Sequence, residues 1–205
     1  WWAANGGYNV HLMEKTPSAV RQGDQLSRAV PTLDLAASRR TPRMIEVGAH
    51  PNIDLMTDSE VEEIGGYIGN FDVKVKRKPR YIDSEKCKDC EKCVAACPVT
   101  DIPDEFNEGL STRRAIYIPF PFAVPPVYSF DGGHCVLLNE GKCGNATLDG
   151  VKEGKEAPPC LEACPGAIDF GQKEETEELT VGTIIVATGY DIEDQRVSAA
   201  YKYGV

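Results

Sequence analysis

The sequence predicts an α/β domain that is interrupted by a smaller, cysteine-rich α+β module. Three observations lead to this prediction. A strand-like stretch at residues 8–14 ends in an acidic residue, and a more apolar strand-like stretch lies near the other end, at residues 183–187. Between them, all eight cysteines fall within residues 87–164. Because the two stretches flank the cysteines, we expect one α/β domain with the module inserted into it.

The first strand-like stretch, "YNVHLME", alternates apolar positions and ends at Glu14. An acidic residue at the end of the second strand of a dinucleotide-binding fold holds the ribose hydroxyls of the cofactor. A glutamate after a strand is more often simply solvated, so both interpretations stay open. The glycine-rich phosphate loop expected about twenty residues upstream is not in the chain.

Residues 61–83 predict a strand, a turn and a second strand, with Gly65, Gly66 and Gly69 at the turns. The basic run from Lys74 to Arg80 alternates with apolar positions. This alternation favours a solvated strand face, and a docking patch for an acidic partner is the alternative. The proline-rich stretch 117–128 is expected to be extended and links two groups of cysteines.

The first group of cysteines has the spacing C-x2-C-x2-C-x3-C-P. Its members are Cys87, Cys90, Cys93 and Cys97. This spacing is that of bacterial ferredoxins, in which three thiolates wrap around one [4Fe–4S] cluster and the fourth reaches a second cluster. We expect Cys97 to begin a short helix and Pro98 to end the loop. A zinc site or disulfides are the alternatives, but zinc sites rarely need three evenly spaced cysteines and a Cys-Pro pair.

The second group is spread out, and its last two members again have the spacing C-x3-C-P. It consists of Cys135, Cys143, Cys160 and Cys164. The polar stretch 144–159 between them is expected to be an inserted loop. Two groups of four account for all eight cysteines. Crossed ligation of the two-cluster type then places Cys164 with the first three cysteines of the first group, and Cys97 with the first three of the second. His134 is expected to have a surface or hydrogen-bonding role.

Composition and charge restrict the class of protein. The chain has 205 residues, 41% of them hydrophobic, and a net charge of −10. This charge argues against a nucleic acid or an anionic membrane as partner. There is no run of eighteen apolar residues and no secretion signal. Clustered cysteines without such a signal predict a reducing, cytoplasmic setting. The start without methionine suggests a piece of a larger polypeptide or a processed chain.

The apolar stretch at residues 183–187 predicts a buried parallel strand, followed by Thr188 and Gly189. A glycine directly after such a strand allows the backbone to approach a ligand or to cross another element closely.

Several stretches together resemble the A-type subunit of heterodisulfide reductase and its bacterial relatives. In order, these are "VHLMEKTPS", "HPNIDLMTDSEV", "GNFDVKVKRKPRYID", "KCKDCEKCVAACPV", "DEFNEGLSTRRAIYIPFPFAVP", "CPGAIDF" and "VGTIIVATGYD". The resemblance implies a partial FAD/NAD(P)-binding domain of the thioredoxin-reductase type at residues 1–78 and 173–205. It also implies an inserted two-cluster ferredoxin module at residues 79–172.

The resemblance further implies an electron-transfer subunit of an oxidoreductase with FAD and two [4Fe–4S] clusters. We accordingly expect Glu14, Lys15, Thr188 and Gly189 to bind FAD. The implied partners are the B- and C-type subunits of heterodisulfide reductase, electron donors of the hydrogenase or dehydrogenase type, and ferredoxin. A cytoplasmic location follows, with association to a membrane complex through partners as the alternative.

The sequence departs from the family in two stretches. Val20 and Arg21 replace a glycine pair in a loop that approaches the flavin. Leu35 and Ser38 replace two cysteines that ligate a further cluster in many members, so we expect that cluster to be absent. Val20, Arg21 and the missing phosphate loop favour a second possibility, a relay and scaffold subunit with a degenerate flavin site. A zinc-stabilised interaction module is a third.

Overall fold

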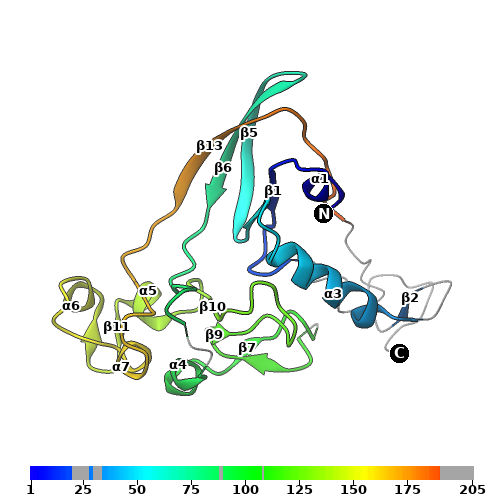
Figure 1. Cartoon of the computed structure of the whole chain (residues 1–205). Helices are drawn as coiled ribbons and strands as arrows, with labels where there is room; N and C mark the ends of the chain where they lie inside the picture. Colours follow the sequence, from blue (N-terminus) through cyan, green and yellow to red (C-terminus); the bar gives the residue numbers. More distant parts are fainter. Residues whose placement is uncertain (20–27, 30–33, 88–89, 108, 190–205) are drawn as a thin grey trace, which may run out of the picture.

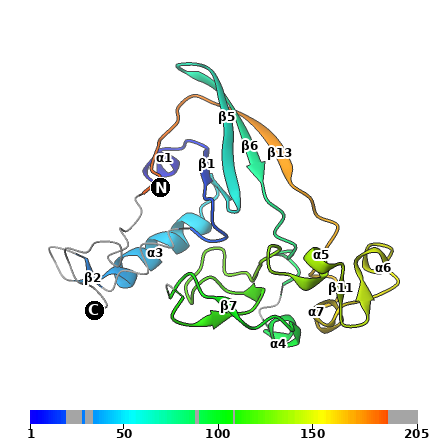
Figure 2. The same ribbon diagram turned by 180° about the vertical axis from the view of Figure 1, so that it is seen from behind.

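The computed structural model describes residues 1–19, 28–29, 34–87, 90–107 and 109–189. These residues form an α/β part, a three-stranded antiparallel sheet and a module of short helices and strands (Figure 1). The long strands of the sheet project away from the rest of the chain. The same arrangement is seen from behind in Figure 2.

The α/β part is a strand–helix–strand unit with short additions. Its elements are α1 (Trp2–Asn5), β1 (Val10–Met13), β2 (Arg28–Ala29), β3 (Asp34–Leu35), α3 (Ala36–Gly48) and β4 (Ile53–Met56). Strands β1 and β4 are parallel, with Val10 opposite Ile53, whereas β2 and β3 form a small antiparallel pair. The strand predicted at residues 8–14 is therefore found, although it begins only at Val10.

The three-stranded sheet has the order β13–β6–β5, with β5 (Ser59–Tyr67), β6 (Asn70–Arg77) and β13 (Glu175–Val181). Strand β6 explains how the sheet packs. Val73 and Val75 are buried in one cluster with Met56. Lys74 and Lys76 alternate with them and form ion pairs with carboxylates at the surface. The prediction of a solvated basic strand face is therefore confirmed for these lysines, whereas Arg80, at the end of the basic run, is largely buried.

The predicted strand–turn–strand is also found, with Gly69 in the turn between β5 and β6. Gly65 and Gly66 lie within β5 rather than in the turn. Gly66 has a φ of +85°, and a Cβ at this position would lie 2.2 Å from the carbonyl oxygen of Asn70. The close return of β6 thus requires a residue without a side chain.

The module lies between β6 and β13 in the sequence. Its helices are α4 (Lys92–Ala96), α5 (Val136–Glu140), α6 (Leu148–Lys152) and α7 (Pro159–Ala163). Its strands form the antiparallel pairs β7 (Ile102–Pro103) with β8 (Thr112–Arg113), β9 (Ile116–Tyr117) with β10 (Ser129–Phe130), and β11 (Lys142–Cys143) with β12 (Ala146–Thr147). Arg77 and Glu175 face each other where β6 and β13 pair, so the two ends of the module lie side by side.

Close contact between helix α3 and the proline-rich stretch connects the α/β part to the module. Met44 of α3 is buried with Phe120, Ala123 and Val124 of that stretch. A Cβ at Gly48 would lie 2.5 Å from a methyl carbon of Val124, so this glycine allows the helix to approach.

Three predictions about local structure are wrong. Residues 183–187 do not form a strand, and Ile185 and Val186 are 80% and 79% exposed. A fully apolar strand is stable only with cover on both faces, and within the described residues no strand pairs with this stretch. The polar stretch 144–159 is not a plain loop, because α6 begins there with Thr147 as its cap. Cys97 does not begin a helix; α4 ends immediately before it.

Among the residues described, none of the helices has the length and apolar character needed to cross a bilayer.

Candidate functional site

One group of thiols forms where the loop before α4 meets the end of α7. Cys93 lies in α4, Cys164 directly follows α7, and the two helices pack together. Burial, together with the neighbouring thiols of Cys164 and Cys87, raises the pKa of the Cys93 thiol to about 11. Cys90 lies in the same loop as Cys87 and is exposed. The structure thus brings Cys164 close to Cys93, which also has Cys87 as a neighbour.

The second group of thiols surrounds a small cavity in the module. Cys97, Cys135, Cys143 and Cys160 are buried and line it together with apolar side chains such as Leu137. Burial, together with the thiols of Cys135, Cys97 and Cys143, raises the pKa of Cys160 to about 12. Cys97 therefore lies with the second group although it belongs to the first run in the sequence.

Backbone pairing near the ends of the module brings the two cysteine runs together. Ile82 and Ile168 form an antiparallel bridge. On either side of it, Asp83 N donates to the Ala167 carbonyl oxygen at 2.9 Å, and the Tyr81 carbonyl oxygen accepts from Asp169 N at 2.9 Å. Because Cys87 follows this bridge closely and Cys164 precedes it closely along the chain, the pairing holds their loops beside each other.

Backbone N–H groups near several sulfur atoms lower the pKa values of these thiols, against the effect of burial. The N–H groups of Leu138 and Leu137 act in this way on Cys135, the N-cap residue of α5. Val94 acts on Cys93, and Leu161 acts on Cys160. Such N–H groups favour the thiolate form, which is the form that binds iron.

An apolar and aromatic shell surrounds both groups. Ile116 and Leu137 are among the largest fully buried side chains. The rings of Tyr81, Phe130 and Phe170 pack against one another, with centroid distances of 5.3 Å for Tyr81–Phe130 and 5.5 Å for Phe130–Phe170. This shell keeps water away from the buried thiols but not from Cys90, which is exposed. Exposure to solvent is one of the factors that set the potential of an iron–sulfur cluster.

The donor set fits [4Fe–4S] clusters. Each group offers four thiol sulfurs, the usual ligand set of such a cluster. Among the described residues, no three or more His, Cys, Asp or Glu side chains gather as they would around a single metal ion. Neither group includes a histidine. His134, next to Cys135, is 57% exposed and bonds through Nδ1 to Asp131 Oδ2 at 2.9 Å, so its predicted hydrogen-bonding role is confirmed.

A charged network next to the second group was not predicted from the sequence. The side chain of Arg113 is only 7% exposed and donates to Glu105 at 2.7 Å through Nε and to Asp131 at 2.8 Å through Nη2. Its guanidinium also lies 3.8 Å from the ring centre of Tyr117. Since Asp131 also holds His134, the network joins β8 to the loop that carries Cys135. An Arg-Arg pair in the sequence gives no signal of such burial.

The four residues expected to bind FAD lie on two separate segments. Glu14 directly follows β1, and its Oε1 accepts from the backbone N and the hydroxyl of Thr16, both at 3.0 Å. Lys15 is exposed, with its Nζ 3.7 Å from a Glu60 oxygen. Thr188 and Gly189 are exposed at the end of the described chain, and Gly189 has a φ of +74°.

The positions at which the sequence departs from the family are only partly described. Val20 and Arg21 lie outside the described residues. Leu35 is 58% exposed in β3. Ser38 lies in α3, but its side chain is outside the described part.

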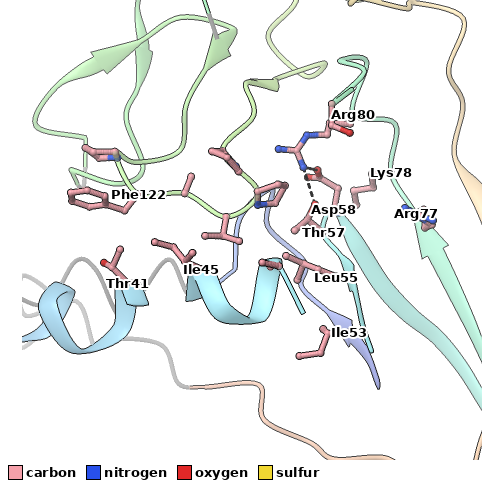
Figure 3. A pocket seen from close by; sticks show the side chains of 18 residues that line it. Thr41, Ile45, Ile53, Leu55, Thr57, Asp58, Arg77, Lys78, Arg80 and Phe122 are labelled. Carbon is pink, nitrogen blue, oxygen red and sulfur yellow. Dashed lines mark hydrogen bonds and ion pairs between the residues drawn. The ribbon is translucent and has the colours of Figure 1, made fainter. Parts of the chain in front are cut away.

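A second cavity, of about 750 Å³, lies between the α/β part and the module (Figure 3). One wall is formed by α3 and β4, with Ile45 and Leu55, and the opposite wall by the proline-rich stretch with Phe122. Asp58 and Arg80 lie at its polar end. Three buried side-chain atoms without a hydrogen-bond partner in the described chain, Thr41 Oγ1, Asp58 Oδ2 and Arg80 Nε, belong to residues of this lining.

The cysteine spacing and a ligand set made only of thiols define an iron–sulfur protein of the ferredoxin type. In agreement, residues 80–100 match the family described as 4Fe-4S binding domain. The chain is also 44% identical over 200 residues to the iron–sulfur A-type subunit of the CoB–CoM heterodisulfide reductase of Methanocaldococcus jannaschii, covering 97% of this chain and 27% of that protein. It is 45% identical to an A-type heterodisulfide reductase-like protein of Archaeoglobus profundus, covering 94% of this chain and 28% of the relative.

A third relative is the A-type subunit of the H2:CoB–CoM heterodisulfide, ferredoxin reductase of Methanothermobacter marburgensis. It is 42% identical over 98% of this chain and 28% of its own length. Over the segment that it spans, the chain belongs to the family of heterodisulfide reductase A-type subunits. It spans little more than a quarter of the length of these relatives.

Proposed function

We propose that this chain is an electron-transfer segment of a heterodisulfide reductase-type oxidoreductase, in which two [4Fe–4S] clusters relay electrons. The observation that carries the proposal is that Cys164 lies near Cys93 of the first sequence run, whereas Cys97 of that run lines a cavity with Cys135, Cys143 and Cys160. This exchange of Cys97 and Cys164 between the sequence runs is typical of two-cluster ferredoxins. The match of residues 80–100 to a 4Fe-4S binding domain supports it.

The chain's own residues would hold the clusters and control their surroundings. The ligands proposed for one cluster are Cys87, Cys90, Cys93 and Cys164. Those proposed for the other are Cys97, Cys135, Cys143 and Cys160. When bound, each cluster supplies a centre that gains and loses single electrons. Buried thiols with a raised pKa must lose their protons on binding, and the N–H groups at α5 and α7 offset part of that cost.

For the α/β part, we propose FAD as the redox partner of the clusters. Glu14, Lys15, Thr188 and Gly189 are the proposed contacts, within a dinucleotide-binding domain that residues 1–78 and 173–205 would share. The parallel strands β1 and β4 support this, because Glu14 follows β1 where an acidic residue holds a ribose in such folds. The module at residues 79–172 would then be an insertion in that domain.

The relatives suggest the partners. Their names describe subunits of reductases that act on the CoB–CoM heterodisulfide and, in one case, on ferredoxin. We propose that this chain also works in a multi-subunit redox complex, with B- and C-type subunits, a donor of the hydrogenase or dehydrogenase type, and ferredoxin. A reducing cytoplasm would keep its clustered cysteines as thiols ready to bind iron.

The first experiment is to purify the protein without oxygen and to measure iron, sulfide and flavin per chain. Two clusters require about eight iron atoms. Flavin together with this iron supports the flavin-linked relay, whereas iron without flavin supports the relay and scaffold alternative. About four iron atoms or fewer in intact, fully loaded protein would overturn the two-cluster assignment.

A pair of matched variants tests the exchanged ligands. Cys97→Ala should damage the cluster of the Cys135 group, and Cys164→Ala should damage that of the Cys93 group. Each variant should retain about four iron atoms, with different electron paramagnetic resonance (EPR) spectra of the remaining cluster. If Cys97→Ala gave the spectrum of a Cys90→Ala variant, the exchange would be wrong.

A further inference from the structure

Arg80 is the residue at which the α/β part and the cysteine-rich module are joined by polar contacts. Its Nη1 donates to the hydroxyl of Thr57, in the connection from β4 to β5, at 2.8 Å. Its Nη2 donates to the carbonyl oxygen of Val127, in the proline-rich stretch, at 3.3 Å. The Asp58 carboxylate lies 3.6 Å from Nη1 (Figure 3). One side chain therefore links its own segment to two others that are distant in the sequence.

The Arg80–Asp58 pair is largely buried, and some of its hydrogen-bonding atoms have no partner among the described residues. The side chains of Arg80 and Asp58 are only 16% and 18% exposed. Arg80 Nε and Asp58 Oδ2 are buried and have no hydrogen-bond partner among the described residues. At 3.6 Å the two groups attract each other without forming a hydrogen bond. Both charges therefore act on their surroundings at reduced screening.

On the module side, Arg80 lies close to the first group of thiols. It immediately precedes Tyr81. The backbone N–H of Tyr81 donates to Gln172 Oε1 at 2.8 Å, and the carbonyl oxygen of Tyr81 accepts from Asp169 N at 2.9 Å. Cys87 N in turn donates to the Asp83 carbonyl oxygen at 3.0 Å. Cys87 is near enough to Arg80 for their charges to interact. The guanidinium is thus held at a fixed place relative to one proposed cluster ligand.

On the α/β side, Asp58 is linked through Thr16 to Glu14, the residue proposed to bind the flavin ribose. Asp58 N donates to the Thr16 carbonyl oxygen at 3.1 Å, and the side chain of Thr16 bonds to Glu14. The Glu14 charge also acts on Asp58. Glu14, Asp58, Arg80 and Cys87 therefore follow one another, through Thr16 and the segment 80–87, from the proposed flavin site to the first thiol group.

We infer that Arg80 and Asp58 set the reduction potential of the cluster at the first thiol group, with opposite signs, and so bias electron flow between that cluster and the flavin. This inference rests on the proposed function. An electron added to the cluster adds one negative charge, which a fixed guanidinium stabilises and a fixed carboxylate opposes. Arg80 is a positioning residue, because it acts on the cluster through its charge and through the segment that leads to Cys87.

The test is a reductive titration of the anaerobically loaded chain with dithionite, which supplies the electron, followed by EPR. Four variants are compared with the native chain: Arg80→Gln, Arg80→Lys, Asp58→Asn and the double variant Arg80→Gln/Asp58→Asn. Asp58 has a φ of +54°, a conformation that asparagine tolerates. Arg77→Gln is the matched control, because Arg77 lines the same cavity but is 47% exposed and lies 3.5 Å from Glu177.

At a fixed potential, Arg80→Gln should lower the ratio of reduced to oxidised first cluster about tenfold, which corresponds to about 59 mV for one electron. Asp58→Asn should raise this ratio by a similar factor, and the double variant should lie near the native value. Arg80→Lys keeps the charge and should stay close to the native potential, as should Arg77→Gln. The second cluster should not respond.

Shifts of the same sign in Arg80→Gln and Asp58→Asn would overturn the inference, because they would indicate a merely structural role. Equal shifts in Arg80→Lys and Arg80→Gln, or no shift in either single variant, would also overturn it. These outcomes leave the proposed function intact as long as native protein holds both clusters. Native protein without a cluster at the first thiol group would refute the proposed function itself, and the inference with it.

Discussion

Replacing Arg113 by methionine should destabilise the module more than the loss of an exposed cation would. Its guanidinium forms charged hydrogen bonds with Glu105 and Asp131 and stacks on Tyr117. Methionine keeps most of the apolar stem but removes the charge. The Asp131 carboxylate, which is 16% exposed, would then lose its buried partner.

The expected loss follows from the burial of the two carboxylates. Glu105 is 48% exposed, so its pair with Arg113 contributes about 1 kcal/mol or less. The charged hydrogen bond from Arg113 to the buried Asp131 carboxylate is also lost, which costs about 2 kcal/mol. The sum is about 3 kcal/mol of unfolding free energy. With a urea slope of about 2 kcal/mol per molar, the unfolding midpoint should fall by about 1.5 M.

The pKa shifts give a second measurement of the same network. Arg113 lowers the pKa of Glu105, against the effect of burial. Burial by itself would raise the pKa of Asp131, but hydrogen bonds from Arg113 and His134 lower it. Lowered carboxylate pKa values stabilise the fold above the ordinary values of 4.5 and 3.8, and this stabilisation is lost as the pH falls through the lowered values. Both pKa values should rise in Arg113→Met, as carbon-13 NMR of the carboxyl groups would show.

The assay is urea unfolding of anaerobically loaded protein at neutral pH, followed by circular dichroism and by the visible absorbance of the clusters. Lys155→Gln is the control, because Lys155 lies in the same module, forms an exposed pair with Glu153 and should change stability by less than about 0.5 kcal/mol. Asp131→Asn introduced into Arg113→Met should restore part of the loss, since it removes the unpaired charge. An unchanged midpoint in Arg113→Met, or no recovery in the double variant, would refute the reasoning.

Two glycines give further predictions. Gly66→Ala should cost about 1–3 kcal/mol, because Gly66 has a φ of +85° and the new Cβ would meet a backbone oxygen at 2.2 Å. Gly65→Ala, with its nearest atom at 3.8 Å, should cost less than about 1 kcal/mol in the same thermal melts, and equal losses would contradict the argument. Gly48→Ala should push α3 away from Val124 and cost about 1–3 kcal/mol. Val124→Ala should recover part of this loss in urea unfolding of the double variant, and independent, additive losses would show that the two residues do not meet.

Local sequence patterns predicted the elements whose cause is local. The alternation of Val73 and Val75 with lysines specified β6, because successive side chains of a strand point to opposite faces. The spacing of the first four cysteines was enough to propose a cluster-binding loop, since the ligands lie within one short stretch. The stretch that ends at Glu14 was likewise found as β1.

Contacts between distant segments decided what the patterns could not. Residues 183–187 have the composition of a buried strand, but burial depends on neighbours that the stretch itself does not contain, and Ile185 is exposed. The burial of Arg113 arises because β8 packs against the loop of Asp131. The Arg-Arg pair in the sequence does not predict this packing. The junction of Arg80 with Thr57, Asp58 and Val127 combines three segments in the same way.

The sequence by itself determined the chemistry of this protein: eight thiols in two sets, and a family to which these sets belong. Their number and spacing depend only on the order of residues along the chain. The spacing also predicted that Cys97 and Cys164 are exchanged between the two sets. Tertiary structure supplied the contacts that bring distant thiols together, because the bridge between Ile82 and Ile168 holds the chain near Cys164 beside the chain near Cys87, and Cys97 packs in one cluster with Leu137 and Cys160. It also decided which charges lie beside them, because burial and distance are properties of the folded chain.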